Sequence, residues 1–574
     1  MTAVLGIKCG PQHDTGAAVV FEDAGQLKCI ALSEERLTRK KQSRSFPELS
    51  IQACLDAANL KLSEVDLVCL DKLGRHTMTE SHLPVGQVPE EAWKAPESEF
   101  FQRAAPVPVV VVNHHAAHAA TAFCVYQMPE AACLIVDGAG SDYPLDESPH
   151  RLISMGALDE EGEVKLNYYD RRAETQSIFH AVRASDGAIR LQRKATSTRS
   201  GIGHFYSFFS RHCLGFGHLQ EGKAMGLAAW GDPQVAAKFP QIPAEVFTGV
   251  DTLVLDHLMA IEHSYRKRVS DPPTDEHFAA RAFWMQEVLN QAIAHLSKSA
   301  IEMTGSRNLC VAGGVALNVV ANRLVRNRLM GAGSIDDMFV QPASSDAGIP
   351  LGAALYGYYV MLGEKLPFQK NIVYLGPEPN QSAAEELIVS QGGRISDNLI
   401  SEVADLLLGE KIVGWWQGRS EYGPRALGAR SILCWPHPPG MKDHLNLRVK
   451  HREAFRPFAP IVREESASRI FDADFPVPYM LFNTQIRPEY SDKIPAVAHV
   501  DGSGRLQTVS RDRVARLYDL LGEVENRDGV GVLLNTSFND AGEPIVESAE
   551  DAISCFRRTG LDAVVCGNAI LLKD

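Results

Sequence analysis

Three histidines follow directly on an apolar run in the segment VVVVNHHAAHAATAF, residues 109–123. The four valines predict a buried strand, Asn113 is a good N-cap, and the Ala-rich residues after it favour a helix. Side chains four residues apart lie on one helix face, so His114 and His118 point the same way and His115 points elsewhere. Two imidazoles on one face can bind a metal ion, but an ordinary pair of half-buried histidines has the same pattern.

Two aspartates stand at the ends of other predicted strands. Asp137 closes the apolar run in AACLIVDGAG, and Asp346 lies in QPASSDAGIPLGAAL, between a strand and an Ala/Gly-rich helix. A carboxylate over a Gly-rich turn can hold a cation, although Asp-Gly also forms ordinary turns and Asp346 would serve as an N-cap. Two imidazoles and two carboxylates form a mixed set that suits Fe(II), Mn(II) or Zn(II).

Glycines follow another predicted strand in CVAGGVALN, where Gly313 and Gly314 precede a helix. Glycine lets a ligand approach the backbone, and a helix N-terminus favours anions. We expect Asn318 one turn into that helix, facing a ligand or a neighbouring turn. The segment GHLQEGKA imitates a phosphate-binding P-loop but lacks the Ser or Thr that binds magnesium, so we keep only Glu221 and Lys223 as candidate site residues.

Cations gather among glycines, prolines and aromatic residues in the C-terminal part of the chain. Arginine forks match phosphate oxygens, and the chain as a whole carries a net charge of −14, so these blocks predict a dedicated anion site. A solvated charged face is the alternative. The blocks are GRSEYGPRALGARSIL with Arg419, Arg425 and Arg430, RVKHREAFRPFAPIV with Lys450, Arg452 and Arg456, HVDGSGRLQTV with Arg505, and LLNTSFNDAGEPIV with Asn535, Ser537 and Asn539.

Length and composition bound the class of protein. A chain of 574 residues with 45% hydrophobic residues predicts two to four globular domains. The Lys/Arg blocks are no longer than TRKK, which argues against a nucleic-acid surface. Eleven scattered cysteines without a C-x-x-C pair indicate neither zinc knuckles nor a disulfide scaffold and fit a reducing cytoplasm. The N-terminus becomes polar too soon for a signal peptide, and no run of 18 apolar residues predicts a membrane span.

The order of predicted elements indicates a mixed α/β protein. The chain opens with strands around the turn GPQHDTG, which contains His13, and a related strand returns at Ala131. We expect irregular structure over 141–200, a helix over 278–303 and a Pro/Gly-rich boundary over 363–379. The second part is expected to end in the strand GVGVLLNTSFN, the helix SAEDAISCFRRTG and the strand LDAVVCGNAILLK.

These blocks, in this order, resemble the signature blocks of the NodU/CmcH family of O-carbamoyltransferases, which includes the tobramycin and novobiocin carbamoyltransferases. The resemblance covers nearly the whole chain. It implies an α/β fold in which residues 1–365 form a duplicated actin/hexokinase-like domain for carbamoyl transfer, similar to the tRNA threonylcarbamoyl-transferase domain. Residues 366–574 are then a YrdC-like α/β domain that forms carbamoyladenylate.

The resemblance also implies the reaction. Carbamoyl phosphate and ATP give carbamoyladenylate, phosphate and pyrophosphate, and the carbamoyl group then moves to a hydroxyl of a small-molecule acceptor. Mg(II) accompanies ATP, and Fe(II) or another divalent transition metal is held by His114, His118, Asp137 and Asp346. The acceptor is open: an antibiotic sugar, a lipo-oligosaccharide and a toxin alcohol are all compatible.

Roles for the remaining site residues follow from the same resemblance. His13 matches the residue that takes the hydroxyl proton, and Lys40, in ERLTRKK, matches a second catalytic residue near the acceptor. The residues implied for carbamoyl phosphate and ATP are Arg425, Lys450, Arg456, Arg505, Asn535 and Ser537. Those implied for carbamoyladenylate in the transfer domain are Glu221, Lys223, Gly313, Gly314 and Asn318.

Three other functions fit the sequence less well. A tRNA threonylcarbamoyl-type modification enzyme conflicts with the acidic charge and with the fused activating domain. The hydrogenase-maturation carbamoyltransferase would carry cysteine pairs, and a non-catalytic actin-like nucleotide-binding regulator would not require the arginine-rich blocks. We expect a cytoplasmic enzyme without nucleic-acid or membrane partners, with a homodimer left open.

Overall fold

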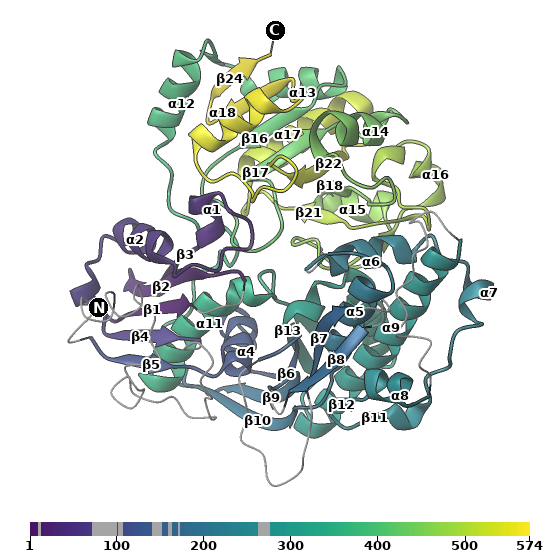
Figure 1. Cartoon of the computed structure of the whole chain (residues 1–574). Helices are drawn as coiled ribbons and strands as arrows, with labels where there is room; N and C mark the ends of the chain where they lie inside the picture. The colour runs from purple at the N-terminus through teal and green to yellow at the C-terminus, as the bar shows by residue number, and fades with distance from the viewer. Residues whose placement is uncertain are drawn as a thin grey trace. The chain divides into compact units, whose positions relative to one another are not determined.

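Two five-stranded sheets with the same strand order form the frame of the first part of the chain (Figure 1). The computed structural model describes residues 1–9, 13–71, 100, 107–140, 152–158, 164–169, 173–217, 219–261 and 276–573. Contacts divide the chain into two compact units. Unit 1 comprises Met1–Ala31 and Arg44–Lys370, and unit 2 comprises Leu32–Ser43 and Asn371–Asp574.

The strands that open the chain form as the sequence predicts. β1 is buried along its whole length, pairs antiparallel with β2 and pairs parallel with β4. The sheet order is β3-β2-β1-β4-β5. Its strands are β1 (Ala3–Lys8), β2 (Gly16–Asp23), β3 (Gln26–Ser33), β4 (Leu67–Leu70) and β5 (Val109–Val111).

The second sheet of unit 1 repeats this arrangement in the order β10-β9-β6-β13-β14. β6 takes the place of β1, because it pairs antiparallel with β9 and parallel with β13. The repeated order confirms the predicted duplicated actin/hexokinase-like architecture. The strands are β6 (Glu130–Val136), β9 (Gln176–Arg183), β10 (Ile189–Ser197), β13 (Asn308–Ala312) and β14 (Asp337–Val340).

The prediction of irregular structure over 141–200 is wrong for much of that stretch. β9 and β10 pair along a long hairpin, and β10 lies at the edge of the sheet, where a strand can keep one face in water and carry many polar residues. A second hairpin pairs β7 (Leu152–Leu158) with β8 (Val164–Tyr169). Residues 141–151, 159–163 and 170–172 lie outside the described residues.

Two helices follow the last strands of the two sheets and lie side by side (Figure 1). They are α4 (His114–Val125) and α11 (Ile349–Tyr356). A Cβ at Gly352 of α11 would lie 2.0 Å from the carbonyl oxygen of Ala117 in α4. A Cβ at Gly6 of β1 would lie 2.0 Å from the carbonyl oxygen of Pro350. Strand and helices therefore pack backbone to backbone, which fixes where α4 begins.

The long helix predicted over 278–303 is α9 (Glu276–Thr304), which packs against β6 of the second sheet. Shorter helices pack around it. They include α5 (Ile202–His212), α6 (Glu221–Ala228), α7 (Pro233–Ala236) and α10 (Val319–Gly331). Elsewhere in unit 1 are α2 (Glu48–Ala57), α8 (Val254–Ile261) and the strand pair β11 (Phe247–Thr248) and β12 (Asp251–Thr252).

Unit 2 is built on one eight-stranded sheet of order β15-β24-β23-β16-β17-β22-β18-β21, which confirms its predicted α/β character. The segment LDAVVCGNAILLK, predicted as one strand, is the hairpin β23–β24, and it turns at Gly567 with φ +59°. The strands are β15 (Arg394–Ile395), β16 (Val413–Trp416), β17 (Arg430–Cys434), β18 (Ala459–Arg463), β21 (Gln507–Val509), β22 (Leu533–Ser537), β23 (Ala563–Cys566) and β24 (Ala569–Leu572).

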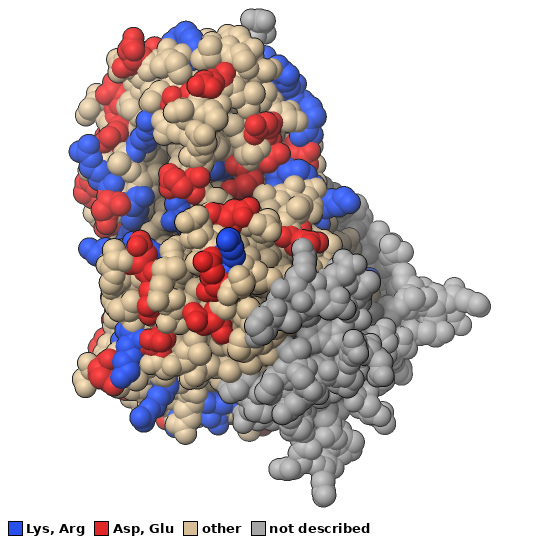
Figure 2. All heavy atoms as spheres, turned by 90° about the vertical axis from the view of Figure 1, so that its left-hand side faces the viewer, with Lys and Arg blue, Asp and Glu red and all other residues tan. Residues whose placement is uncertain are grey.

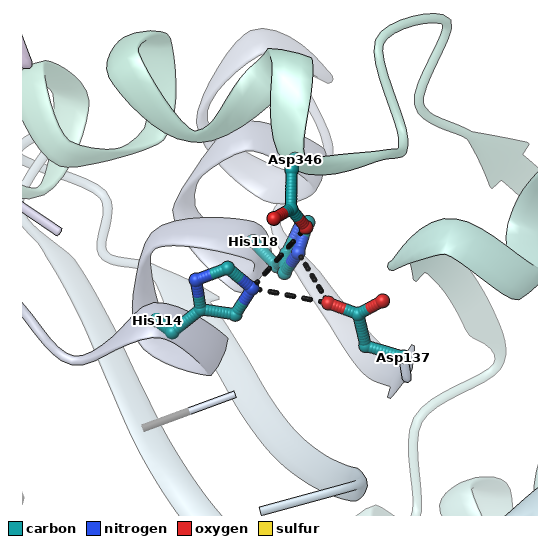
Figure 3. A group of neighbouring side chains, drawn as sticks. All are labelled: His114, His118, Asp137 and Asp346. Carbon is teal, nitrogen blue, oxygen red and sulfur yellow. Dashed lines mark hydrogen bonds and ion pairs between the residues drawn. The ribbon is translucent and has the colours of Figure 1, made fainter. Parts of the chain in front are cut away.

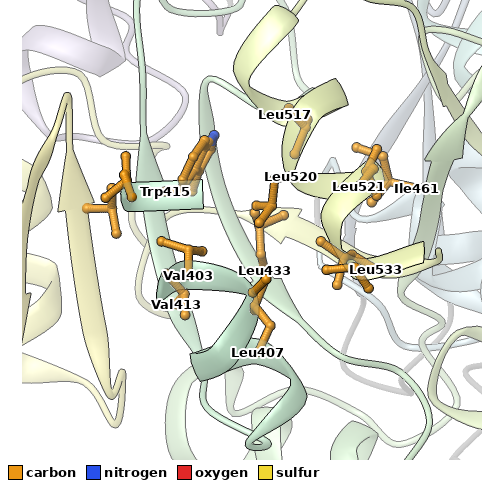
Figure 4. Packing of buried hydrophobic residues seen from close by; sticks show 14 of the residues in the cluster. Val403, Leu407, Val413, Trp415, Leu433, Ile461, Leu517, Leu520, Leu521 and Leu533 are labelled. Carbon is orange, nitrogen blue, oxygen red and sulfur yellow. The ribbon is translucent and has the colours of Figure 1, made fainter. Parts of the chain in front are cut away.

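Two helices pack their apolar faces on this sheet to form the core of unit 2 (Figure 4). α13 (Leu399–Leu408) brings Leu407 and α17 (Ala515–Asp528) brings Leu520 to the buried cluster that contains Trp415. The remaining elements are α12 (Gln381–Ser390), α14 (Met441–Leu445), α15 (Glu464–Ile470), α16 (Pro488–Ser491), α18 (Ala549–Arg558), β19 (Thr484–Gln485) and β20 (Ser503–Gly504).

A short segment from early in the sequence belongs to unit 2. It contains α1 (Glu34–Thr38), in which Nη2 of Arg36 donates to the carbonyl oxygen of Glu421 at 2.8 Å. Arg39 donates to the carbonyl oxygens of Ile545 at 2.6 Å and Pro544 at 2.9 Å. Unit 2 is thus discontinuous in sequence, and residues 32–43 pack with its C-terminal elements.

The close packing of α4 and α11 predicts a position that does not tolerate a side chain. Gly352→Ala should lower the free energy of unfolding by about 1–3 kcal/mol, because the added methyl would overlap a backbone oxygen. Calorimetric melting of the purified chain measures this. Gly331→Ala, at a helical glycine with open space around it, is the matched control and should melt no earlier than the wild type. An unchanged melting temperature in Gly352→Ala would contradict the packing.

Candidate functional site

The four side chains predicted as a metal-binding set converge in unit 1 (Figure 3). His114 and His118 project from α4, Asp137 directly follows β6, and Asp346 begins a 3-10 turn after β14. One ligand atom from each lies within 4.8 Å of all the others, and all four residues are buried. The duplication explains the meeting: α4 and the Asp346 turn each follow the last strand of a sheet, and Asp137 follows a central strand.

The imidazoles and carboxylates of this group face one another closely. Nε2 of His114 lies 3.0 Å from Oδ2 of Asp137 and 3.5 Å from Oδ1 of Asp346. Nε2 of His118 lies 3.3 Å from the same Asp137 oxygen. Burial would raise the pKa of Asp137, but hydrogen bonds with the two histidines hold it well below its ordinary value. The group therefore keeps its carboxylate ionised and offers nitrogen and oxygen ligands toward one point.

Asp71, which the sequence analysis did not select, orients His114. Its Oδ1 lies 2.8 Å from Nδ1 of His114, and both side chains are fully buried. Burial opposes protonation of His114, but Asp71 and Asp346 raise its pKa well above the ordinary value. A carboxylate on the far nitrogen is a common partner of metal-binding histidines. The sequence pattern that could have identified Asp71 is VDLVCLD, an apolar strand followed by an aspartate, as in LIVD before Asp137.

The two carboxylate ligands are held from outside as well. The backbone N–H groups of Gly138 and Gly314 donate to Oδ1 of Asp137 at 2.7 and 3.3 Å. Lys8, buried at the end of β1, places Nζ 2.9 Å from Oδ2 of Asp346. Each carboxylate thus has one oxygen engaged by the protein and the other facing the histidines, which is the arrangement of a preorganised site.

The residues fit a divalent transition ion. Asp71, Asp137 and Asp346 bring three buried carboxylates, and Lys8 brings one buried ammonium, so two further positive charges neutralise the group when the imidazoles are neutral. A divalent cation supplies that charge, and the mixed imidazole and carboxylate donors suit the transition metals. The buried His/Asp group can therefore bind a metal ion.

His115, the third histidine of the opening motif, points away from this group as predicted. Its Nδ1 lies 2.7 Å from Oγ of Ser177. Burial lowers its pKa to about 3, so the ring is neutral. His115 belongs to a hydrogen-bonded cluster behind the N-terminus of α4.

The two residues predicted to be catalytic lie in different units. His13 is half-buried in unit 1, with Nδ1 3.0 Å from Oδ2 of Asp14. Burial opposes protonation of His13, but Asp14 and the nearby Asp346 carboxylate raise its pKa above the ordinary value. Lys40 is exposed in the segment 32–43 of unit 2. Within unit 1, the fold brings His13 into the electrostatic surroundings of the His/Asp group.

The glycine turn lies against the same group, but the helix after it begins later than expected. Gly313 has φ +93°, and a Cβ there would lie 2.2 Å from the carbonyl oxygen of Val136, so only glycine fits. A 3-10 turn, Gly314–Leu317, intervenes before α10. Asn318 is the N-cap of α10, not a residue one turn inside it, and its side chain is bound by Gln286.

Glu221 and Lys223 both lie on α6. Oε1 of Glu221 accepts from Oγ of Ser207 in α5 at 2.7 Å, and Nζ of Lys223 lies 5.9 Å from the centre of the Phe216 ring. The same helix α5 brings Tyr206, which donates to Gln286, the partner of Asn318. Glu221 and Asn318 are thus linked through α5, although they come from separate parts of the sequence.

Four arginines gather in unit 2, and we call Arg425, Arg452, Arg456 and Arg505 the arginine cluster. Burial lowers the pKa of every member, to about 10 for Arg425 and to about 9 for Arg452, and neighbouring arginines add to the shift at Arg425, Arg452 and Arg505. At Arg456, Glu453 opposes the effect of burial. The Nε atoms of Arg425, Arg452 and Arg505 are buried without a hydrogen-bond partner in the part of the chain that the structure describes. Such a cluster is stabilised by an anion. Arg452, in RVKHREAFRPFAPIV, is not among the residues predicted to bind carbamoyl phosphate and ATP.

The other two arginines of GRSEYGPRALGARSIL have a different role. Arg430 is buried and donates to the carbonyl oxygens of Glu547 at 3.0 Å and Gly418 at 2.9 Å. Arg419 donates to the carbonyl oxygen of Gly376 at 2.6 Å. Their hydrogen bonds to carbonyl oxygens indicate that Arg419 and Arg430 hold the loop around Arg425.

The remaining predicted residues of the anion site support its walls. Nζ of Lys450 lies within hydrogen-bond distance of Ser537 O, at 2.6 Å, and of Asn539 Oδ1, at 2.7 Å. Asn535 donates to Gln507 Oε1 at 2.8 Å and to the carbonyl oxygen of Ala426 at 3.2 Å. Its Oδ1 is buried without a partner among the described residues. Lys450 thus anchors the loop after β22, and Asn535 ties that strand to the segment beside Arg425.

The surface in Figure 2 carries interspersed basic and acidic side chains on its described part. Nucleic acids bind to continuous basic patches, and the described residues of that face form none. Among the described helices, none is both long and apolar enough to cross a membrane.

The contact between Asp71 and His114 predicts an effect on metal binding. Asp71→Asn should weaken binding of a divalent transition ion about 10- to 100-fold, because the amide no longer holds the imidazole as a carboxylate does. Metal content after equilibrium dialysis against Mn²⁺ measures this. Asp186→Asn, which removes an exposed carboxylate paired with Lys365, is the control and should bind as the wild type does. Equal metal content in Asp71→Asn and wild type would rule out the orienting role.

Comparison with known proteins finds two family matches along the chain. The carbamoyltransferase N-terminus family matches residues 3–98 and 93–355, and the carbamoyltransferase C-terminus family matches residues 404–573. Nodulation protein NolNO of Sinorhizobium fredii is 34% identical over 98% of this chain and 79% of its own length, and nodulation protein U of the same species is 36% identical over 62% and 64%. The crystal structure of T. kodakarensis HypF covers 65% of this chain and 48% of its own, at 14% identity and a TM-score of 0.36, a likeness too weak to carry an argument. The two family matches together span most of the chain, which therefore belongs to the carbamoyltransferase family.

Proposed function

We propose that this carbamoyltransferase is ATP-dependent and carbamoylates a hydroxyl group of a small molecule. In the first half-reaction, carbamoyl phosphate, ATP and one water give carbamoyladenylate, phosphate and pyrophosphate. The water is consumed when carbamoyl phosphate releases its phosphate, and the resulting carbamate displaces pyrophosphate from ATP. In the second, the acceptor oxygen attacks the carbamoyl carbon, the bond to AMP breaks, and AMP leaves. We assign the first step to unit 2 and the second to unit 1.

The arginine cluster is the observation that carries the first assignment. Three guanidinium groups keep a buried Nε without a partner among the described residues, and neighbouring arginines lower the pKa of these same three. Such a site is costly without an anion and binds a polyanion strongly. Carbamoyl phosphate and the phosphates of ATP supply negative charge, and the arginines stabilise the charge that develops on the leaving pyrophosphate.

The His/Asp group supports the second assignment. His114, His118, Asp137 and Asp346 would hold a divalent ion, which when bound supplies polarisation of a carbonyl or of the acceptor oxygen. His13, whose imidazole lies in the electrostatic field of Asp346, receives the hydroxyl proton. The glycine turn borders the ligand group, since the backbone N–H of Gly314 donates to Asp137, and we assign the adenylate to this place, with Lys223 offering a charge for its phosphate.

The division into half-reactions predicts opposite phenotypes for two variants. Arg505→Ala should lower carbamoyl-phosphate-dependent release of pyrophosphate at least about 100-fold, because the variant loses a positive charge that stabilises the developing anion. His13→Ala should leave that release unchanged in the absence of acceptor and block transfer to acceptor. Arg511→Ala, an exposed arginine of the same unit, is the matched control. Loss of pyrophosphate release in His13→Ala would contradict the division, and absence of carbamoyl-phosphate-dependent ATP turnover in the wild type would indicate a regulator.

The metal assignment predicts that binding and transfer fail together. His118→Ala removes one of the four ligands, and we expect loss of bound transition metal and of carbamoyl transfer, with pyrophosphate release retained. Elemental analysis of the purified chain and the two half-reaction assays measure this. His180→Ala, a half-buried histidine outside the group, should keep its metal. Full metal occupancy in His118→Ala would defeat the assignment.

A further inference from the structure

We propose that Arg193 is a positioning residue for the metal site: its guanidinium clamps the first turn of α4 and thereby sets the places of His114 and His118. The proposal rests on the metal assignment made above. Arg193 lies on β10, outside the ligand group, and its guanidinium carbon lies 4.6 Å from the centre of the Phe179 ring.

The N-terminus of α4 is capped by two side chains, not one. Oδ1 of Asn113 accepts from the backbone N–H of Ala116 at 2.9 Å, as a normal N-cap does. Oε1 of Glu174, far away in sequence, accepts from the backbone N–H of His115 at 3.1 Å. Two of the N–H groups that a helix leaves unpaired at its start are therefore satisfied inside the protein.

One guanidinium holds both of these caps. Nη2 of Arg193 donates to Oδ1 of Asn113 at 2.7 Å, and Nη1 donates to Oε2 of Glu174 at 2.8 Å. Nη1 also lies 2.9 Å from Oγ of Ser177, the hydroxyl that contacts His115. Because the fork of an arginine is planar and rigid, its two ends fix the relative places of the two caps. His114 is the first residue of the turn so held.

The same region anchors the segment that carries Asp137. The backbone N–H of Gly140 donates to the carbonyl oxygen of Glu174 at 2.7 Å, and that of Asp137 donates to the carbonyl oxygen of Thr175 at 2.9 Å. A Cβ at Gly140 would lie 2.5 Å from Cγ of Glu174, so the two segments touch. Residues 174 and 175 thus connect the start of α4 with the Asp137 turn.

The charge of Arg193 does not explain this arrangement by itself. Arg193 and Glu174 form an ion pair, with Glu174 fully buried, so together they add no net charge behind the metal group. Their effect on a bound ion is therefore one of geometry. Partners outside the ligand shell typically change metal affinity 10- to 100-fold when removed.

Cobalt binding tests the clamp without any assay of activity. The full chain, stripped of metal, is titrated with Co²⁺, whose visible absorption reports both affinity and coordination. We expect Arg193→Gln to weaken Co²⁺ binding about tenfold and to change the absorption spectrum. Arg307→Gln removes an exposed arginine paired with Asp336 in the same unit and should leave both unchanged.

A second variant covers the case in which Arg193→Gln does not fold. Asn113→Ala removes the cap oxygen that Arg193 holds and leaves the ion pair with Glu174 in place. It should also weaken Co²⁺ binding, and the double variant should lose less than the product of the two single effects, because both act on one contact. Wild-type affinity and spectrum in folded Arg193→Gln or in Asn113→Ala would overturn the clamp alone. Failure of the wild type to bind Co²⁺ in a His118-dependent manner would overturn the metal assignment and the clamp with it.

Discussion

Buried like charges need a partner of opposite sign, and both sites of this protein are arranged around that constraint. In unit 1, Asp71, Asp137 and Asp346 gather three carboxylates, and Lys8 and a protonated imidazole offset part of their charge. In unit 2, the arginine cluster gathers four cations, and neighbouring members lower the pKa of Arg425 and Arg505. Desolvation makes each cluster costly, and each is stabilised by a ligand: a cation in unit 1 and an anion in unit 2.

The duplicated sheet explains how unit 1 can bring carboxylates and imidazoles to one point. Both sheets end their parallel strands at the loops that lead into α4 and α11, and the two helices pack backbone to backbone at Gly352. A side chain placed directly after a strand therefore meets its counterpart from the other half. Asp71 meets His114 within one half, because Asp71 follows β4 and β4 pairs parallel with β5, the strand that leads into α4.

Many polar side chains near these sites hold loops and helix ends in place and have no assigned role in the chemistry. Lys450 contacts backbone and side-chain oxygens of the loop after β22, and Arg430 donates to carbonyl oxygens around Arg425. Arg193 and Glu174 do the same for the first turn of α4. A ligand site needs its donors within fractions of an ångström of their places, so the outer contacts decide how well the inner ones perform.

The sequence by itself determined the features that depend on local pattern. The strand before Asn113, the helix after it, the shared face of His114 and His118, the strand that ends before Asp137 and the strand that precedes Asp346 all follow from periodicity and capping, which act over a few residues. The tertiary structure alone decided which segments meet. The meeting of the four ligands, the packing of residues 32–43 with unit 2, the edge position of β10 and the pairing of Asn318 with Gln286 depend on contacts between distant parts of the chain. The sequence likewise could not tell that Arg425 joins the arginine cluster while Arg430, five residues later, binds carbonyl oxygens, because the two have the same chemistry and differ only in what surrounds them.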